Sequence, residues 1–114
     1  MLFDELSFHD ATMLEVKEDT SNQTLDFILD FPVDWKNNVF KNKVLRFKDA
    51  IVYIKKEIPF LGRPSILEIK QLDSHKHTYK SANGIIESSK YKIEIVTNAG
   101  SRFVEFNEAE LFDV

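Results

Sequence analysis

The chain between residues 91 and 106 shows the most regular alternation of hydrophobic and polar positions in the sequence. The alternation runs on both sides of the short segment Ala99-Gly100. Alternation with period two on either side of a Gly-containing turn is typical of a β-hairpin. If Ala99-Gly100 forms a two-residue turn, Ile95 faces Val104 on one buried face of the sheet.

The same register pairs Ile93 with Phe106. A three-residue turn with Gly100 in the left-handed conformation is the alternative. That turn would leave Glu105 facing Ile93, so the two-residue turn is favoured.

Further strands are predicted by the pattern at residues 12–17, 24–31, 44–54 and 65–72. The first and second should form a hairpin, with Leu14 and Val16 buried in the first. Pro32 is expected to end the second strand because proline has no N–H to donate to a ladder. Asp49 interrupts the third and indicates a bulge or an edge position.

The remaining segments have weaker patterns. Residues 2–8 suit one helical turn or an irregular lead-in, and the polar residues 73–89 suit an extended hairpin or a mobile loop. Residues 107–114 are acidic, with Leu111 and Phe112 available to dock on the sheet.

These segments together predict one all-β domain over residues 1–114. Its expected architecture is a single antiparallel sheet of about six strands, folded into a half-barrel or small sandwich, with little helix. The side chains predicted to be buried are Leu25, Phe27, Leu29, Phe47, Ile93, Ile95, Val104 and Phe106.

Composition supports a packed core, since 43% of the residues are hydrophobic and ten are Phe. The chain has no Cys, which excludes disulfides, thiolate metal sites and a cysteine nucleophile. No secretory signal or membrane-spanning apolar run is visible. The expectation is a cytoplasmic protein that does not bind membranes.

The net charge of −4 is unevenly distributed along the chain. Residues 1–35 hold nine acids and one base, whereas residues 36–80 hold eleven bases and four acids. Residues 81–114 are again acidic. Such segregation indicates surfaces of opposite sign, unless folding brings the segments together and cancels their fields.

Two groups of residues have spacings that merit testing as sites. Asp73, His75 and His77 alternate, so on one strand their side chains could converge on a metal. The group lacks a fourth ligand and lies beside Lys76 and Lys80, so no metal or cofactor is predicted.

His9 and Asp10 form the second group. Adjacent residues on an extended chain point apart, which argues against a base and its orienting partner. The favoured interpretation is structural: Asp10 caps the turn into the first strand, and His9 packs or bonds a backbone carbonyl.

Trp35, the one Trp, lies in a polar connection and is a candidate interface anchor; folding back over the core is the alternative. No nucleophile elbow and no Gly-rich phosphate loop is present, so no enzyme is predicted. The bases of residues 36–80 are interleaved with aromatic residues, but the overall acidity argues against nucleic-acid binding.

Three segments carry a family resemblance: residues 6–14 with Phe8-His9-Asp10-Ala11, residues 25–29, and residues 45–50. They resemble small bacterial all-β proteins with a Phe-His-Asp-Ala opening, among them the immunity protein 50 type of polymorphic-toxin systems. The resemblance covers about the first half of the chain. It implies a cytoplasmic, non-enzymatic protein that binds and blocks a cognate toxin through a surface.

The sequence therefore favours a binding protein whose partner is a cognate protein toxin with a basic face. The predicted partner-binding residues are Trp35, Asp26, Asp30, Asp34 and His9. A small-ligand or metal-binding β-domain that uses residues 73–77 is the alternative, followed by a structural or scaffold domain.

Overall fold

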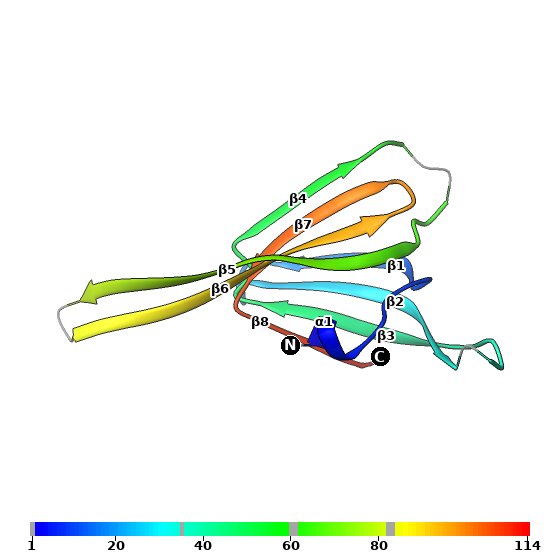
Figure 1. Ribbon diagram of the computed structural model, residues 1–114, viewed down its shortest axis with the longest axis horizontal. Helices are drawn as coiled ribbons and strands as arrows, with labels where there is room; N and C mark the ends of the chain where they lie inside the picture. The colour runs from blue at the N-terminus through cyan, green and yellow to red at the C-terminus, as the bar shows by residue number, and fades with distance from the viewer. Residues whose placement is uncertain (1, 35, 60–61, 82–83) are drawn as a thin grey trace.

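A computed structural model describes residues 2–34, 36–59, 62–81 and 84–114, and for Glu5, 73–81 and 84–89 it describes the backbone only. Within these ranges the chain forms one short helix and eight strands (Figure 1). The elements are α1 (Leu2–Glu5), β1 (Thr12–Asp19), β2 (Thr24–Asp34), β3 (Val39–Lys48), β4 (Val52–Glu57), β5 (Ile66–Ser81), β6 (Gly84–Thr97), β7 (Gly100–Phe106) and β8 (Glu108–Asp113).

The described strands form two four-stranded antiparallel sheets, which we call sheet A (β1-β2-β3-β8) and sheet B (β4-β7-β6-β5). The sheets do not close into a barrel. The prediction of an all-β antiparallel fold is confirmed in its sandwich form, with two sheets in place of one folded sheet.

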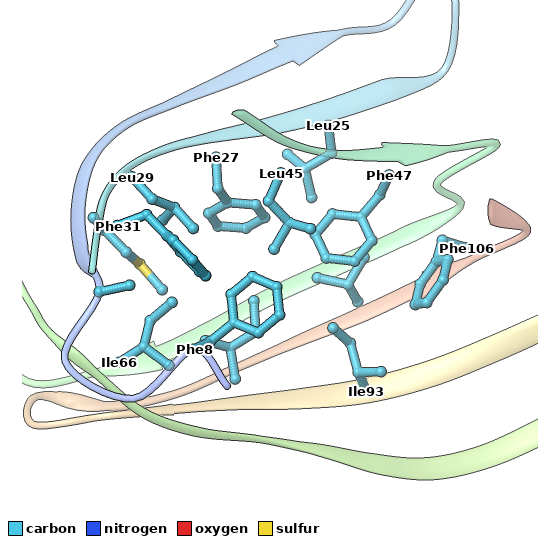
Figure 2. Close-up of a cluster of buried hydrophobic side chains, with 14 residues drawn as sticks. Phe8, Leu25, Phe27, Leu29, Phe31, Leu45, Phe47, Ile66, Ile93 and Phe106 are labelled. Atoms are coloured by element: carbon cyan, nitrogen blue, oxygen red, sulfur yellow. The ribbon is translucent and has the colours of Figure 1, made fainter. Parts of the chain in front are cut away.

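The hydrophobic core lies between the two sheets (Figure 2). All eight side chains that the alternation predicts to be buried are buried. Aromatic rings join the layers: the Phe47 ring of sheet A lies 4.8 Å from the Phe106 ring of sheet B and 5.6 Å from that of Phe27. Such ring pairs add to the stability that burial alone provides.

The predicted register of the last hairpin is wrong by two residues. Ile93 pairs with Val104 and Thr97 with Gly100, so the turn consists of Asn98 and Ala99. A register shift of two residues keeps every side chain on its predicted face, so the predicted buried residues are confirmed although the register is wrong.

Gly100 is needed for its contact with β4. A Cβ built on it would overlap the carbonyl oxygen of Lys56, and its φ is +144°. The glycine therefore allows β4 to approach β7 closely, although the sequence pattern had assigned it to the turn.

The single strand predicted over residues 44–54 is two strands that belong to different sheets. Asp49 takes the left-handed conformation (φ 53°) and ends β3, after which the chain crosses to sheet B as β4. The chain returns at Asn107, whose N–H donates to the Lys48 carbonyl. The acidic residues after Asn107 dock as a full strand, β8, which accounts for part of the higher strand count.

Two local predictions for sheet A are also corrected. A bulge between Met13 and Glu15 resets the alternation of β1, so Met13 is buried and Leu14 is not. Pro32 does not end β2, which continues to Asp34. The pairing of β2 with β1 stops at Asp30, so a residue without an N–H is tolerated beyond that point.

The two open sides of the sandwich are built differently. On one side α1 packs near β5, where Gln71 donates to Asp4, and the Phe3 ring reaches Phe47 and Phe106 at 6.1 and 6.2 Å. On the other side β1 and β4 are the edge strands of their sheets, and a groove remains between them.

Two hairpins extend beyond the four-stranded parts of the sheets (Figure 1). The backbone of β5 and β6 stays paired out to Ser81 and Gly84, well past Tyr91, where β7 stops. The extended-hairpin alternative for residues 73–89 therefore holds for the described backbone. At the opposite end of the molecule, β2 and β3 continue past their neighbours as a shorter ribbon.

Candidate binding surfaces

The end of the β2–β3 hairpin exposes more hydrophobic side chain than its fold requires. Val33, Val39 and Phe40 are 43%, 44% and 38% exposed. They lie on either side of the turn at residues 36–38, and we call these three residues the hairpin cluster. Exposed apolar residues at the end of a hairpin are candidates for an interaction site.

A hollow of about 430 Å³ adjoins the hairpin cluster at Val33. It is lined by Leu2, Leu6, Ser7, Phe31, Pro32, Val33, Lys43 and Leu111. Most of its lining is apolar, and Leu6 is itself 40% exposed. Val33 joins the hollow to the hairpin cluster, whereas Val39 and Phe40 are consecutive on β3, so their side chains point to opposite faces of the hairpin.

Asp34 shapes the turn beside the hairpin cluster. Its carboxylate accepts hydrogen bonds from the N–H of Lys36 (3.1 Å), from the N–H of Asn37 (3.3 Å) and from the Asn37 side chain (2.7 Å). These bonds from Asn37 and Lys36 hold the pKa of Asp34 below its ordinary value. Asn38 then takes the left-handed conformation, with φ 55°.

The β1–β2 turn repeats this chemistry. Asp19 accepts from the N–H groups of Ser21 and Asn22 and from the Asn22 side chain, and Gln23 has φ 53°. The pKa of Asp19 is lowered in the same way, first by the Asn22 side chain. Asp34 is therefore a turn-forming residue, as Asp19 is.

The other two predicted partner-binding acids lie on the outer face of β2. Asp26 is held by Arg46 of β3 in a bidentate ion pair, with Nε–Oδ1 and Nη2–Oδ2 distances of 2.8 and 2.9 Å. Asp30 is half-buried and pairs with Asn42 in the strand register. Asp26, Asp30 and Asp34 follow one another at about 13 Å along the strand, so they do not form one compact acidic cluster.

His9 takes the structural role favoured from the sequence, whereas the cap expected of Asp10 stays a prediction. The His9 Nδ1 atom lies 2.9 Å from the Leu67 carbonyl oxygen, which ties the lead-in to β5. The argument that the two side chains point apart is wrong, because Asp10 has φ 68° and its Oδ1 lies 3.5 Å from His9 Nε2. A left-handed residue folds the chain where an extended one would separate the groups.

The groove between β1 and β4 has a charged floor. It holds about 480 Å³ and is lined from β1 by Glu15 and Glu18 and from the other side by Tyr53, Lys55 and Arg63, among others. Arg102 lies at its base. A second hollow of about 310 Å³ continues past Arg102 toward Ile58.

Arg102 is fully engaged inside the protein. Its Nε and Nη2 atoms donate to the two carboxylate oxygens of Glu57 at 2.6 and 2.9 Å, and Nη1 donates to the Tyr53 hydroxyl at 3.1 Å. The side chains of Arg102 and Glu57 are only 6% and 4% exposed. Within the described residues no buried side-chain nitrogen or oxygen lacks a hydrogen-bond partner.

The hydrogen bonds among Arg102, Glu57 and Tyr53 change the pKa values of these groups. Burial alone would raise the pKa of Glu57, but the hydrogen bonds and charge of Arg102 outweigh it, so the pKa lies below the ordinary value. Burial raises the pKa of Tyr53, with Arg102 acting in the opposite direction. A carboxylate held ionised by an arginine is a poor proton donor or acceptor at neutral pH, so Glu57 serves the structure of the groove.

Some predicted site residues fall outside the described parts of the chain. Trp35 is one of them, and the side chains of Asp73, His75 and His77 are the others. The backbone of these last three lies on β5. In the described parts of the chain, no cluster of three or more His, Cys, Asp or Glu residues could hold a metal ion. No helix among the described residues is long and apolar enough to cross a membrane.

The sequence missed two features of these surfaces. The partner of Arg102 is 45 residues away, and no local pattern connects them. The hairpin cluster could have been anticipated, because Val33, Val39 and Phe40 flank Trp35 in a segment that was treated as a connection.

The fold defines an antiparallel two-sheet protein with an apolar hairpin at one end and a charged groove along one side. The chain matches no protein-family model, no curated protein and no solved structure. The resemblance to immunity proteins therefore rests on the sequence motifs alone.

Proposed function

We propose that this protein is a non-enzymatic cytoplasmic binding protein that neutralises a cognate protein toxin through the end of its β2–β3 hairpin. The observation that carries the proposal is the hairpin cluster beside an apolar hollow. The turn of the β1–β2 hairpin has the same hydrogen bonds but polar flanks, so the turn itself does not need exposed Val and Phe.

The charged groups of the molecule favour binding over catalysis. Asp26, Asp34 and Glu57 each accept hydrogen bonds from arginines or from turn donors, which leaves them in structural roles. An apolar anchor at the centre of an interface, with charged residues such as Lys36 and Lys41 around it, is the usual anatomy of a protein–protein contact.

This assignment changes which residues should be tested for partner binding. Replacing Asp26 and Asp34 would disturb an ion pair and a turn, so loss of binding in such variants would not identify an interface. Phe40 and Val39 are exposed, and polar replacements there leave the core intact.

The experiment is co-expression with each toxin-like protein encoded beside this one. We expect a toxin that arrests growth alone and is tolerated when the intact protein is present. The double variant Val39→Ser/Phe40→Ser should lose that protection. Leu67→Ser, an equally exposed position on β5, is the matched control and should keep it.

Two results would count against the proposal in different ways. Protection by the hairpin variant equal to that of the intact protein would remove the hairpin as the binding site. Failure of the intact protein to protect against any neighbouring toxin would remove the immunity function itself.

A further inference from the structure

Four strands form the edges of the two sheets, and three of them have features that prevent pairing with another strand. The pairing of β1 shifts at a bulge next to Met13, and that of β5 shifts at two places. The third, β8, holds Glu108, Glu110 and Asp113 within six residues, so a second acidic strand would be repelled. Bulges and edge charges are the common means by which proteins block edge pairing.

The fourth edge strand, β4, lacks a bulge, and its three charged residues, Lys55, Lys56 and Glu57, are of both signs, unlike those of β8. Its register with β7 is regular from Val52 to Glu57. The chain also exposes three isoleucines at or next to this strand: Ile51, Ile54 and Ile58 are 54%, 45% and 70% exposed. A regular edge with exposed β-branched residues is a template for another strand.

The hydrogen bonds of β4 show which of its backbone groups are available. The Ile58 N–H donates to the Ala99 carbonyl at 3.0 Å. Because backbone direction alternates along a strand, Ile54 and Lys56 also point their N–H and C=O groups toward β7. The N–H and C=O groups of Tyr53, Lys55 and Glu57 therefore point outward.

From this geometry we propose that the β4 edge pairs with the β4 edge of a second copy of the chain, antiparallel about a twofold axis at Ile54. In that register Ile54 faces its own counterpart, Tyr53 faces Lys55, and Val52 faces Lys56. About four backbone hydrogen bonds form across the axis, from the outward groups of Tyr53 and Lys55. The two copies of sheet B become one continuous sheet.

The lysines and the length of β4 together select this register. Strands that pair about a twofold axis place one residue against its own counterpart. An axis at Lys55 or at Lys56 would set two ammonium groups directly opposite each other, which is unfavourable. An axis at Ile54 sets no like charges directly opposite, and it gives a longer overlap of the two strands than an axis at Tyr53 or at Lys56.

Single cysteines test the register, because the chain has no Cys of its own. Ile54 would occupy a non-hydrogen-bonded pair, where the two Cα atoms are about 4.5 Å apart and a disulfide can form. We expect Ile54→Cys to give a disulfide-linked dimer under mild oxidation. Lys56→Cys and Ile58→Cys are the controls, since their counterparts would be about 13 and 26 Å away.

A second measurement separates strand pairing from other contacts. Lys55→Pro removes an outward N–H without breaking the ladder to β7, whereas Lys55→Ala removes the same charge and keeps the N–H. Sedimentation up to about 1 mM protein should show the intact chain and Lys55→Ala approaching twice the monomer mass. Lys55→Pro should remain monomeric, with an unchanged circular dichroism spectrum.

Three outcomes would overturn the inference. One is a monomer at every concentration together with no cross-linking of Ile54→Cys. Another is equal cross-linking of all three cysteine variants, which indicates random collision. The third is a dimer that Lys55→Pro leaves intact, which indicates a contact elsewhere on the surface.

Discussion

Two arginine–carboxylate pairs join neighbouring strands of this protein, and they differ in almost everything but their geometry. Arg102 of β7 forms an ion pair with Glu57 of β4, and Arg46 of β3 forms one with Asp26 of β2, each through two hydrogen bonds. The first pair lies at the base of the groove, with side chains 6% and 4% exposed. The second lies on the outer face of sheet A, 37% and 16% exposed.

The outer pair belongs to a row of alternating charges. The strand registers place Lys17 beside Asp26, Asp26 beside Arg46 and Arg46 beside Glu110. Arg46 also lies over the Phe112 ring, 5.0 Å from its centroid. Neighbours of opposite charge on a solvated face favour this register of the strands and contribute little to stability.

In the buried pair, the cost of removing the charges from water is set against the hydrogen bonds that the two groups form. Removing both charges from water is unfavourable, and the pair is tolerated because each guanidinium nitrogen of Arg102 donates a hydrogen bond. The opposite side of the sandwich, where Phe3 packs, shows that this fold can close with apolar groups instead. Removing an arginine should therefore lower the free energy of unfolding strongly for the pair in the groove and only slightly for the pair on the outer face.

The largest expected effect follows from removing one member of the buried pair. Arg102→Ala leaves the Glu57 carboxylate buried without its partner, and the free energy of unfolding should fall by about 3–5 kcal/mol. Urea unfolding followed by circular dichroism measures the loss.

A double replacement separates the effect of the two charges on stability from the effect of the volume that the two side chains fill. Glu57→Met together with Arg102→Leu removes both charges and keeps apolar volume, so most of the lost stability should return. If the double variant is as unstable as the sum of the single ones, the pair is not the source of the effect.

The next largest loss of stability is expected from the apolar core beside Arg102. Ile95 is fully buried and faces Arg102 in the register of β6 and β7. Ile95→Ala should reduce the free energy of unfolding by about 2–5 kcal/mol, from lost burial and the cavity left behind. Val96→Ala, whose half-buried side chain faces outward, is the control and should change stability far less. A urea midpoint for Ile95→Ala equal to that of the intact protein would contradict the core placement.

These regions also show how far the sequence could predict the fold. Alternation assigned the buried faces correctly even where the register was wrong, since burial depends on parity and an even shift preserves it. It failed at Asp49 and at Leu14, where a left-handed residue and a bulge reset the parity. The bulge has no reliable signature in a single sequence, whereas Asp49 marked an interruption of the pattern without showing that the chain changes sheets there.

The candidate surfaces were less predictable for a physical reason. The Arg102–Glu57 pair depends on two strands that meet only after the chain has crossed between the sheets. The acids Asp26 and Asp34 were predicted to bind a partner because sequence shows charge and not the cation or N–H group that each one meets. Trp35 lies outside the described residues, so its role as an interface anchor stays a prediction.

A smaller effect is expected from pH. The pKa of Glu57 is lower in the folded protein than its ordinary value of 4.5, so the ionised form contributes stability above that value. This contribution is lost as the pH falls through the folded pKa. The difference in unfolding free energy between the intact protein and Glu57→Gln should therefore stay constant above pH 4.5 and shrink as the pH falls below that value.

Comparing the intact protein with Glu57→Gln cancels the pH dependence contributed by the other groups with shifted pKa values. Asp19, Asp34 and Asp113 also have lowered pKa values, but both proteins contain them. A gap that stays constant on acidification would mean that the charge of Glu57 does not support the fold.

The smallest effect should come from the outer pair, and salt should reveal it. Arg46→Gln removes the charge opposite Asp26 while keeping part of the stem over Phe112, and the urea midpoint should fall only slightly at low ionic strength. In about 1 M NaCl the screening length is near 3 Å, so the difference from the intact protein should disappear. The loss caused by Arg102→Ala should persist in the same salt, because its groups are shielded from solvent ions. An Arg46→Gln loss that matches that of Arg102→Ala, or that ignores salt, would contradict the claim that burial separates the two pairs.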